Sequence, residues 1–456
     1  MLKRISISAA MTVVLGLLAV PLAGPASADP PTDFWQHKPF LNMAHAGGAY
    51  EAPANTLFAF KKAVENGADQ LEMDGYVTAD GEFVVTHDLS PNATSNIAET
   101  AYAGMTVDEM TLAELKTLDF AHKFSPGKGH YNYDPTDPHP YRGMALADGP
   151  EPPEGYERND FRITTFREVL ETFPDTPLNI DMKAPRSNPA MATAAANVLA
   201  AIMADYPERS EDVIVASFFQ GAMERFHELL PEHQALSASE DVLLPYALQG
   251  TPINPTPVAL QPPDYYDYAG LTVQPVQLLR TRATRDGYAI HVWPGNGSVD
   301  GPALWQKMID QGADGFFTDH PAALNEFLCI KRVPRPDGSA RQCADTVPTA
   351  LKIGPAKGKI KAGKKRTVRL TVRATAGDGP DSFRVSLRSS NKRVTLPRSV
   401  TVRLTTDAVT GVATGTTKVR LKARKNAKGK VRITAAGQSL KATSVLKVKK
   451  AKGHRR

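Results

Sequence analysis

Two acids and two histidines fall within one stretch of the chain, between residues 45 and 88. Glu72 and Asp74 lie two positions apart in the strand-like run QLEMD. Because side chains alternate along a strand, these two carboxylates point to the same side. Acids held so close repel each other, and a shared hard cation is the commonest reason for such an arrangement. His45 and His87 each follow an apolar run, so the stretch offers two metal ligands and two acid/base groups.

The elements that position these groups alternate between strand and helix patterns from residue 40 to about 325. The strand patterns cover 41–45, 70–77, 83–87, 178–182, 213–218, 235–238, 271–273, 289–293 and 315–318. The helix patterns cover 56–65, 112–118, 165–172, 189–205, 221–230 and 302–311. With 83–87 set aside as a hairpin partner, eight strands with helical crossovers predict an α/β fold, a (β/α)8 TIM-type barrel.

Reactive groups of such a barrel lie at the carboxyl ends of its strands. The residues at or near those ends are His45, Glu72, Asp74, Asp181, Trp293 and Asp319. This agreement between the strand pattern and the chemistry is stronger than any single motif. Asp319, which stands before His320 and Pro321, is equally suited to cap the final helix and to touch a ligand.

Residues 120–160 break this alternation. The segment is rich in Pro, Gly, Tyr, Asp and His and shows no periodicity. A loop of this length is usually either functional or disordered. Its aromatic residues and its place between barrel strands favour a lid over the mouth of the barrel, and an insertion without a role stays open as the alternative.

A set of short motifs follows the same order along the chain. They are HAGG (45–48), PANT (53–56), AF (59–60), GAD (67–69), EMD (72–74), TADG (78–81), HD (87–88), NIDMK (179–183) and GADGFFTDHP (312–321). In this order they resemble the glycerophosphodiester phosphodiesterase family, whose signature runs HRG, PENT, AF, GA, E-x-D, TxDG, HD and TDxP. The resemblance covers roughly residues 40–325.

The resemblance implies a metal-dependent enzyme that hydrolyses glycerophosphodiesters to glycerol 3-phosphate and an alcohol. It makes His45 and His87 the catalytic pair, in which one imidazole takes a proton from the nucleophile and the other protonates the leaving alkoxide. It makes Glu72, Asp74 and Asp181 the ligands of a divalent metal ion. Whether the nucleophile is water or a neighbouring glycerol hydroxyl stays open.

Two further residues are expected at the substrate. Lys183, with the cation, neutralises the non-bridging phosphate oxygens as charge builds in the transition state. Trp293 either forms a wall for the glycerol or simply covers the barrel core. Oxygen-only ligands in an exported protein favour calcium over magnesium.

The chain departs from the family pattern in its phosphate contacts. Ala46 replaces the arginine of HRG, which removes a bidentate contact that a lysine does not fully replace. Ala54 replaces the glutamate of PENT, although Glu51 is close enough to substitute if the loop bends. Asp181 replaces a longer glutamate. We expect an active phosphodiesterase, with two alternatives: an inactive barrel acting as a binding protein, and a phospholipase D-like enzyme on the same fold.

Residues 1–28 read as an export signal. A basic start precedes an apolar run from residue 9 to 20, and Ala26-Ser27-Ala28 forms a small-residue cleavage site. We therefore expect a secreted, extracellular protein, whose two cysteines, Cys329 and Cys343, most simply form one disulfide within a linker over 326–346. Zinc is disfavoured at this pair because no other cysteine exists to complete a site.

Charge divides the chain in two. Residues 346–456 contain 30 of the 54 Lys and Arg residues but only 3 of the 48 Asp and Glu residues. This asymmetry indicates a separate domain over 347–456 with an anionic partner. Alternating runs rich in Val, Thr, Lys and Arg predict a small all-β sandwich there.

An anionic cell-wall polymer or a membrane surface is the expected partner of this basic domain. Nucleic acid is disfavoured, because Phe383 is the only aromatic residue available for stacking among Phe, Tyr and Trp. A solubilising appendage without a specific partner is the remaining alternative.

Overall fold

The computed structural model describes residues 34–36, 38–268, 271–342, 348–375, 382–406, 412–437 and 440–449. The predicted export signal, residues 1–28, lies outside these ranges, as does Cys343. The disulfide between Cys329 and Cys343 therefore stays a prediction. No helix in the described ranges is both long and apolar enough to cross a bilayer.

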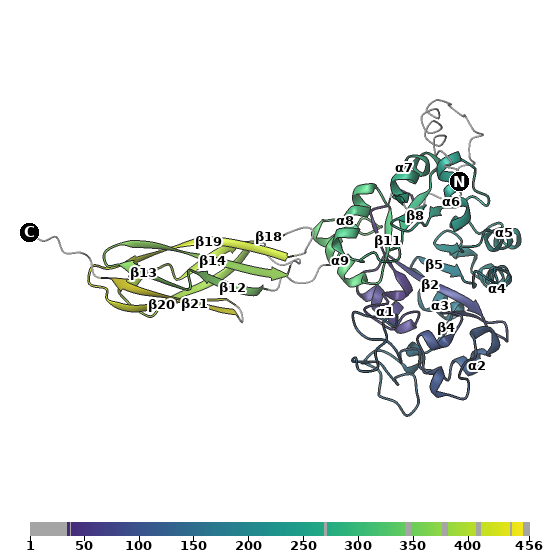
Figure 1. Cartoon of the computed structure of the whole chain (residues 1–456), viewed down its shortest axis with the longest axis horizontal. Helices are drawn as coiled ribbons and strands as arrows, with labels where there is room; N and C mark the ends of the chain where they lie inside the picture. Colours follow the sequence, from purple (N-terminus) through teal and green to yellow (C-terminus); the bar gives the residue numbers. More distant parts are fainter. Residues whose placement is uncertain are drawn as a thin grey trace, which may run out of the picture.

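The N-terminal body is a mixed α/β fold (Figure 1). Its strands are β1 (Leu41–Ala44), β2 (Gln70–Val77), β3 (Phe83–Val85), β4 (Thr164–Thr165), β5 (Leu178–Met182), β6 (Val213–Ala216), β7 (Ala259–Leu260), β8 (Tyr266–Tyr268), β9 (Leu271–Val273), β10 (Ala289–Val292) and β11 (Gly315–Thr318). Its α-helices are α1 (Leu57–Glu65), α2 (Leu112–Leu115), α3 (Phe166–Thr172), α4 (Ala190–Ala204), α5 (Gln220–Leu229), α6 (Glu240–Gln249), α7 (Pro275–Asp286), α8 (Pro302–Gln311) and α9 (Pro321–Ile330).

Parallel pairing curls the central sheet around on itself. β1 pairs with both β2 and β11, β2 continues to β5 and β6, and β11 continues to β10 and β7. Isolated parallel bridges from Val215 to Leu236 and from Ser237 to Ala259 join β6 to β7. The sheet is therefore of the TIM-barrel type, with the strand ends that carry the predicted chemistry brought to one side.

The strand prediction is wrong at one position. Residues 271–273 form β9, which pairs antiparallel with β8 as a hairpin outside the curled sheet. The place next to β10 is taken by the two-residue strand β7, which is too short to show a pattern in the sequence. The expected hairpin of β3 against β2 is confirmed.

Helix ends follow local sequence signals. Thr56 caps α1, where its hydroxyl accepts a hydrogen bond from the Ala59 amide at 3.2 Å. Proline opens α7, α8 and α9 at the first turn, where its missing N–H costs nothing. Gly287 and Gly312 end α7 and α8 in the left-handed conformation that favours glycine.

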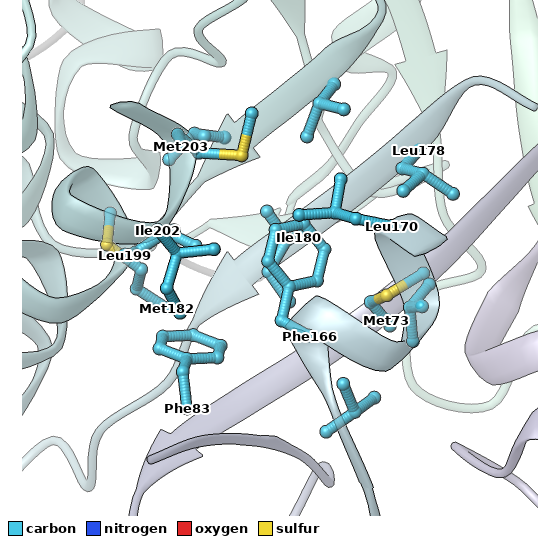
Figure 2. Packing of buried hydrophobic residues seen from close by; sticks show 14 of the residues in the cluster. Met73, Phe83, Phe166, Leu170, Leu178, Ile180, Met182, Leu199, Ile202 and Met203 are labelled. Carbon is cyan, nitrogen blue, oxygen red and sulfur yellow. The ribbon is translucent and has the colours of Figure 1, made fainter. Parts of the chain in front are cut away.

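Apolar side chains between the sheet and its outer helices form the core that holds the strand ends in place. Figure 2 shows part of it, with Met73, Ile180 and Met182 from neighbouring strands packed against Phe83 and Phe166. The glycine in the middle of β2, Gly75, leaves the space that Phe83 fills, because a Cβ there would lie 2.0 Å from its ring. This packing fixes the backbone of β2 directly beside Asp74.

The segment after α9 is tied back onto the barrel by one buried ion pair. Arg341 donates to Asp69 Oδ2 at 2.5 Å and to Asn325 Oδ1 at 3.3 Å. Asp69 also accepts from the Asn42 amide at 2.9 Å. Both members of the pair are buried, so residues 331–342 belong structurally to the barrel.

The described residues of the C-terminal body form strands and loops without a helix (Figure 1). Its strands are β12 (Pro348–Gly354), β13 (Lys357–Lys361), β14 (Lys365–Thr375), β15 (Ser382–Ser389), β16 (Val394–Thr395), β17 (Ser399–Arg403), β18 (Thr405–Thr406), β19 (Val412–Ala423), β20 (Gly429–Gly437) and β21 (Leu440–Lys449). They form two five-stranded sheets, one in the order β12-β14-β19-β16 with β18 beside β19, the other β13-β21-β20-β15-β17. One apolar cluster takes side chains from both sheets, among them Leu370 and Val431, so the sheets pack face to face as a sandwich.

Candidate active site

One cavity of about 390 Å³ lies at the carboxyl ends of the barrel strands. It is lined by all seven residues predicted to carry out catalysis, hold metal or contact substrate: His45, Glu72, Asp74, His87, Asp181, Lys183 and Trp293. They come from five separate strand ends or adjoining turns, as the TIM-type fold requires. Folding therefore gathers into one place groups that are up to 248 positions apart in the sequence.

His45, the first residue after β1, is held by Asp319. Its Nδ1 lies 2.7 Å from Asp319 Oδ1, so Nε2 is the free nitrogen for chemistry. Burial lowers the pKa of His45, but the attraction of Asp319, followed by that of Glu72, outweighs burial and raises the pKa to about 10. The carboxylate thus orients the imidazole and favours its protonated form.

Asp300 in turn positions Asp319 and the residue before it. The carboxylate of Asp300 accepts hydrogen bonds from the Asp319 amide and the Thr318 hydroxyl, both at 2.8 Å, and from the Trp305 indole at 2.6 Å. The residue that caps α9 is His320. Asp319 is therefore not the capping residue of α9, and its carboxylate lines the cavity and bonds to His45.

The turn after β1 aims a backbone amide at Glu72. Ala46, Gly47 and Gly48 all have positive φ, at 49°, 79° and 91°, and alanine tolerates that region at a cost of roughly 1–2 kcal/mol. The Ala46 amide donates to Glu72 Oε2 at 2.9 Å. Burial and the neighbouring Asp74 nevertheless raise the pKa of Glu72 to about 7.

Asp74 and Asp181 face each other from the neighbouring strands β2 and β5. Lys183 bridges them, with its Nζ 3.0 Å from Asp74 and 2.9 Å from Asp181. Burial raises the pKa of Asp74, but Lys183 and then His87 outweigh it and hold that pKa low. Lys183, expected at the substrate, is thus bonded to two of the three predicted metal ligands while it lines the cavity.

The carboxylates fit a hard cation in their chemistry. Glu72, Asp74 and Asp181 supply only oxygen donors, the set that calcium and magnesium prefer. Asp181 Oδ1 is buried and has no hydrogen-bond partner among the described residues. Within those residues, however, no three His, Cys, Asp or Glu side chains surround one point as a preformed metal site. The ammonium of Lys183 lies between Asp74 and Asp181 and bonds to both.

His87 lies two residues after the end of β3 and lines the cavity. Its Nδ1 lies 3.3 Å from Asp88 Oδ1. Asp74 is the main cause that raises the pKa of His87, and the Asp88 hydrogen bond adds to it. The cavity therefore has one histidine oriented by Asp319 and a second oriented by Asp88.

The cavity has aromatic and polar walls that the sequence did not reveal. Tyr131 comes from the 120–160 insertion and Tyr266 from the β8–β9 hairpin. Phe218 meets Trp293 edge to face with ring centroids 6.2 Å apart. The Trp293 indole donates to the backbone of Gln261 at 2.9 Å, which fixes its ring in the wall. Only the aromatic content of the insertion pointed towards any of these residues.

Two of the three family departures lie close together. Ala46 and Ala54 form a small buried cluster with Ala49, so an arginine and a glutamate have been exchanged for an apolar pair. The expectation that Glu51 substitutes at the site is wrong. Its carboxylate instead accepts from the Ala322 amide at 3.1 Å at the start of α9, where the helix end favours negative charge.

Residues 45–323, more than half of the chain, match the model of the glycerophosphoryl diester phosphodiesterase family. The chain belongs to this family. The resemblance seen in the motifs is thereby confirmed, and the protein is an enzyme of the phosphoric diester hydrolase class. The match ends at residue 323, so the basic sandwich lies outside it.

The chain is similar to individual proteins over different shares of its length. The glycerophosphodiester phosphodiesterase of Bacillus subtilis (strain 168) is 25% identical over 335 residues, which cover 70% of this chain and 97% of that protein. A lysophospholipase D of Rattus norvegicus is 30% identical over 146 residues, 31% of this chain and 36% of its own length. A solved phosphodiesterase from Oleispira antarctica, in complex with the product sn-glycerol-3-phosphate, has a TM-score of 0.43 and 20% identity, over 63% of this chain and 96% of that one.

Proposed function

We propose that the protein hydrolyses small glycerophosphodiesters outside the cell, releasing glycerol 3-phosphate and an alcohol. The observation that carries this proposal is the single cavity in which two oriented histidines face three carboxylates and a lysine. The named activity of the Bacillus subtilis relative supports the same substrate class.

In the proposed reaction the two histidines divide the proton transfers. One imidazole takes a proton from the attacking hydroxyl as the new O–P bond forms. The other gives a proton to the alkoxide as the old P–O bond breaks, so the alcohol leaves neutral. Asp319 keeps His45 in the orientation that this exchange needs.

We assign Glu72, Asp74 and Asp181 as the residues that hold a divalent cation. Such an ion would neutralise charge on the phosphate oxygens, and calcium suits oxygen ligands in an exported protein better than magnesium. Lys183 is already charged and buried beside the same carboxylates, so it provides a second positive group for a bound phosphodiester.

We further propose roles for parts of the chain that do not take part in the proton transfers or hold the metal. The insertion over 120–160 acts as a lid, supported by Tyr131 in the cavity wall. Trp293 forms the wall for the glycerol, since its ring is fixed in the cavity lining. The export signal delivers the chain outside the cell, where the basic domain holds it to an anionic cell-wall polymer or membrane surface.

Release of glycerol 3-phosphate from glycerophosphodiesters, with and without a chelator, tests the proposal. Turnover that the chelator abolishes and calcium restores is the expected result. Absence of turnover in the intact protein would favour a barrel that only binds. Turnover of intact phospholipid or lysophospholipid in preference to glycerophosphodiesters would favour the phospholipase D-like alternative, for which the Rattus norvegicus relative gives a partial precedent.

A further inference from the structure

One end of the C-terminal sandwich gathers positive charge. Three loops meet there: residues 362–364 between β13 and β14, 390–393 between β15 and β16, and 424–428 between β19 and β20. We call this the far end, because β12 begins at the opposite end with Pro348 paired to Ala374. The exposed cations of the three loops are Lys364, Lys392, Arg393, Arg424, Lys425 and Lys428.

The loops of the far end are bound to one another. The Gly363 amide donates to the Ala423 carbonyl at 3.0 Å, and the Arg424 amide donates to the Arg393 carbonyl at 2.9 Å. The Asn391 side chain donates to the Lys428 carbonyl at 3.2 Å. These hydrogen bonds fix the three loops, and with them the six cations, relative to one another. Loop motion therefore does not relieve the repulsion between the cations.

The strands that lead into the far end continue the same charge. Lys365 stands directly opposite Lys422, and Lys430 directly opposite Lys447, which also pairs with Lys359 on its other side. All five are exposed. Like charges opposite each other destabilise a sheet. No Asp or Glu occurs in the described part of the sandwich to compensate them, so the arrangement lowers folding stability unless an anion binds.

The surface also limits what that anion can be. The large apolar side chains that are exposed all lie before residue 300 among the described residues, so the sandwich offers nothing to insert into a bilayer. Its one aromatic residue, Phe383, is buried and cannot stack on bases. The cations surround the end on both sheets and on the loops, whereas a flat bilayer would meet only one side of them.

From this geometry we infer that the far end of the sandwich is a binding site for a flexible linear polymer of phosphate or phosphodiester groups. Such a chain can follow cations around an edge and needs no apolar contact. The inference rests on the proposed function, in which the basic domain holds an anionic partner, and it names both the place and the ligand class.

The test compares two full-length variants with equal charge loss. The far-end variant carries Lys392→Gln, Lys425→Gln and Lys428→Gln. The control variant carries Arg384→Gln, Arg403→Gln and Lys441→Gln, exposed positions at or towards the opposite end of the sandwich. Binding of long-chain inorganic polyphosphate is measured against salt concentration, with phosphatidylglycerol vesicles as a second probe.

We expect the far-end variant to bind polyphosphate roughly tenfold more weakly than the parent at low salt. The slope of the logarithm of the binding constant against the logarithm of the salt concentration should fall in magnitude by about 2, since each lost phosphate contact removes about 0.7 from it. The control variant should keep the parent's slope. Equal weakening in both variants would overturn the site, because only net charge would then matter.

Two further outcomes separate this inference from the proposed function. Binding to vesicles but not to polyphosphate would overturn the polymer ligand while leaving an anionic partner in place. Binding to neither probe would overturn the inference and the anchoring role together, and glycerol 3-phosphate release, measured on the same preparations, would still report on the phosphodiesterase. The melting temperature of the sandwich should be equal or higher in the far-end variant, because it relieves repulsion without touching the apolar core.

Discussion

In the barrel, charged side chains at the cavity sit beside partners of opposite sign, as Lys183 does between Asp74 and Asp181. In the described part of the sandwich every charged side chain is a lysine or an arginine, and like charges face each other across strands. The carboxylates of Glu72, Asp74 and Asp181 at the cavity are buried, whereas the charged side chains in the described part of the sandwich, apart from Arg366, are exposed. Burial in low dielectric makes an ion pair strong enough to orient a reactive group, whereas exposed charge of one sign attracts a distant polyanion.

The comparison also separates the sources of stability. The barrel depends on buried polar contacts, such as Arg341 with Asp69, as well as on its apolar core. The sandwich has no acidic partner for its cations in the described residues, so its apolar core alone must outweigh repulsion. The two bodies should therefore respond differently to mutation, to metal and to pH.

The largest expected effect is at Asp74. Asp74→Asn should abolish turnover while leaving the fold nearly intact, because it removes one charge from the proposed cation site. It should also abolish the stabilisation that calcium gives the parent, about 2.7 kcal/mol at a concentration 100 times Kd. Thermal melts with and without calcium measure this, with the exposed Asp108→Asn as control. If Asp74→Asn still gains the parent's increase in Tm, the site is assigned wrongly.

The two histidines should each be nearly essential. His45→Ala or His87→Ala should lower kcat by about 10²–10⁴-fold on an unactivated diester, and the double variant should lose less than the product of the two. On a nitrophenyl phosphodiester, whose leaving group needs no proton, the variant lacking the general acid should recover much of its rate. Near-parent rates in both single variants would exclude the catalytic pair.

Arg341 tests how much the barrel depends on a buried ion pair. Arg341→Leu leaves Asp69 buried without its main partner and should lower the free energy of unfolding of the barrel by about 3–5 kcal/mol. The transition of the sandwich should not move. The double variant Asp69→Asn/Arg341→Leu should recover part of the loss, since Asn can still accept from the Asn42 amide. An equal loss in the free energy of unfolding in the single and the double variant would show that Arg341 stabilises the barrel by packing and not by its charge.

Asp319 should act through His45 rather than on the substrate. Asp319→Asn weakens one charge-assisted hydrogen bond, worth about 1.5–3 kcal/mol, so we expect kcat to fall roughly ten- to hundredfold. KM should stay near the parent value, and the pH profile of kcat should shift to lower pH because the carboxylate no longer raises the pKa of His45. A rise in KM with unchanged kcat would instead place Asp319 in substrate binding.

The last prediction concerns acid sensitivity. Burial lowers the pKa of His291 to about 3, below its unfolded value of about 6.5. Between these two values only the unfolded chain takes up the proton, so the contribution of His291 to stability is full above pH 6.5 and falls by about 1.4 kcal/mol per pH unit below it.

Denaturant unfolding of His291→Met from pH 7 to pH 4 measures that contribution. The barrel of the variant should lose less stability on acidification than the parent barrel. The described residues of the sandwich contain no Asp, Glu or His, so its transition should move less with pH than that of the barrel and serves as the internal reference. Equal acid loss in the variant and the parent barrel would show that other groups control the pH dependence.

The sequence by itself determined the parts that depend on local spacing. Alternation along one strand put Glu72 and Asp74 on the same side, and both line the cavity. Periodicity and capping residues located most helices of the first half of the barrel, and the charge count separated the basic domain. These signals are local because strand alternation and helix capping involve neighbours only a few positions apart.

Only the tertiary structure decided which distant residues meet. Asp319 reaches His45 across 274 positions, and Ala46 and Ala54 form an apolar pair that their separate motifs did not indicate. The strand next to β10 is two residues long, too short for any periodicity, so its place depends on pairing with its neighbours. Lys183 was expected at the substrate, yet it lies between Asp74 and Asp181. A buried ammonium is stabilised by the nearest carboxylates. The position of these carboxylates is set by the strands that pack around them.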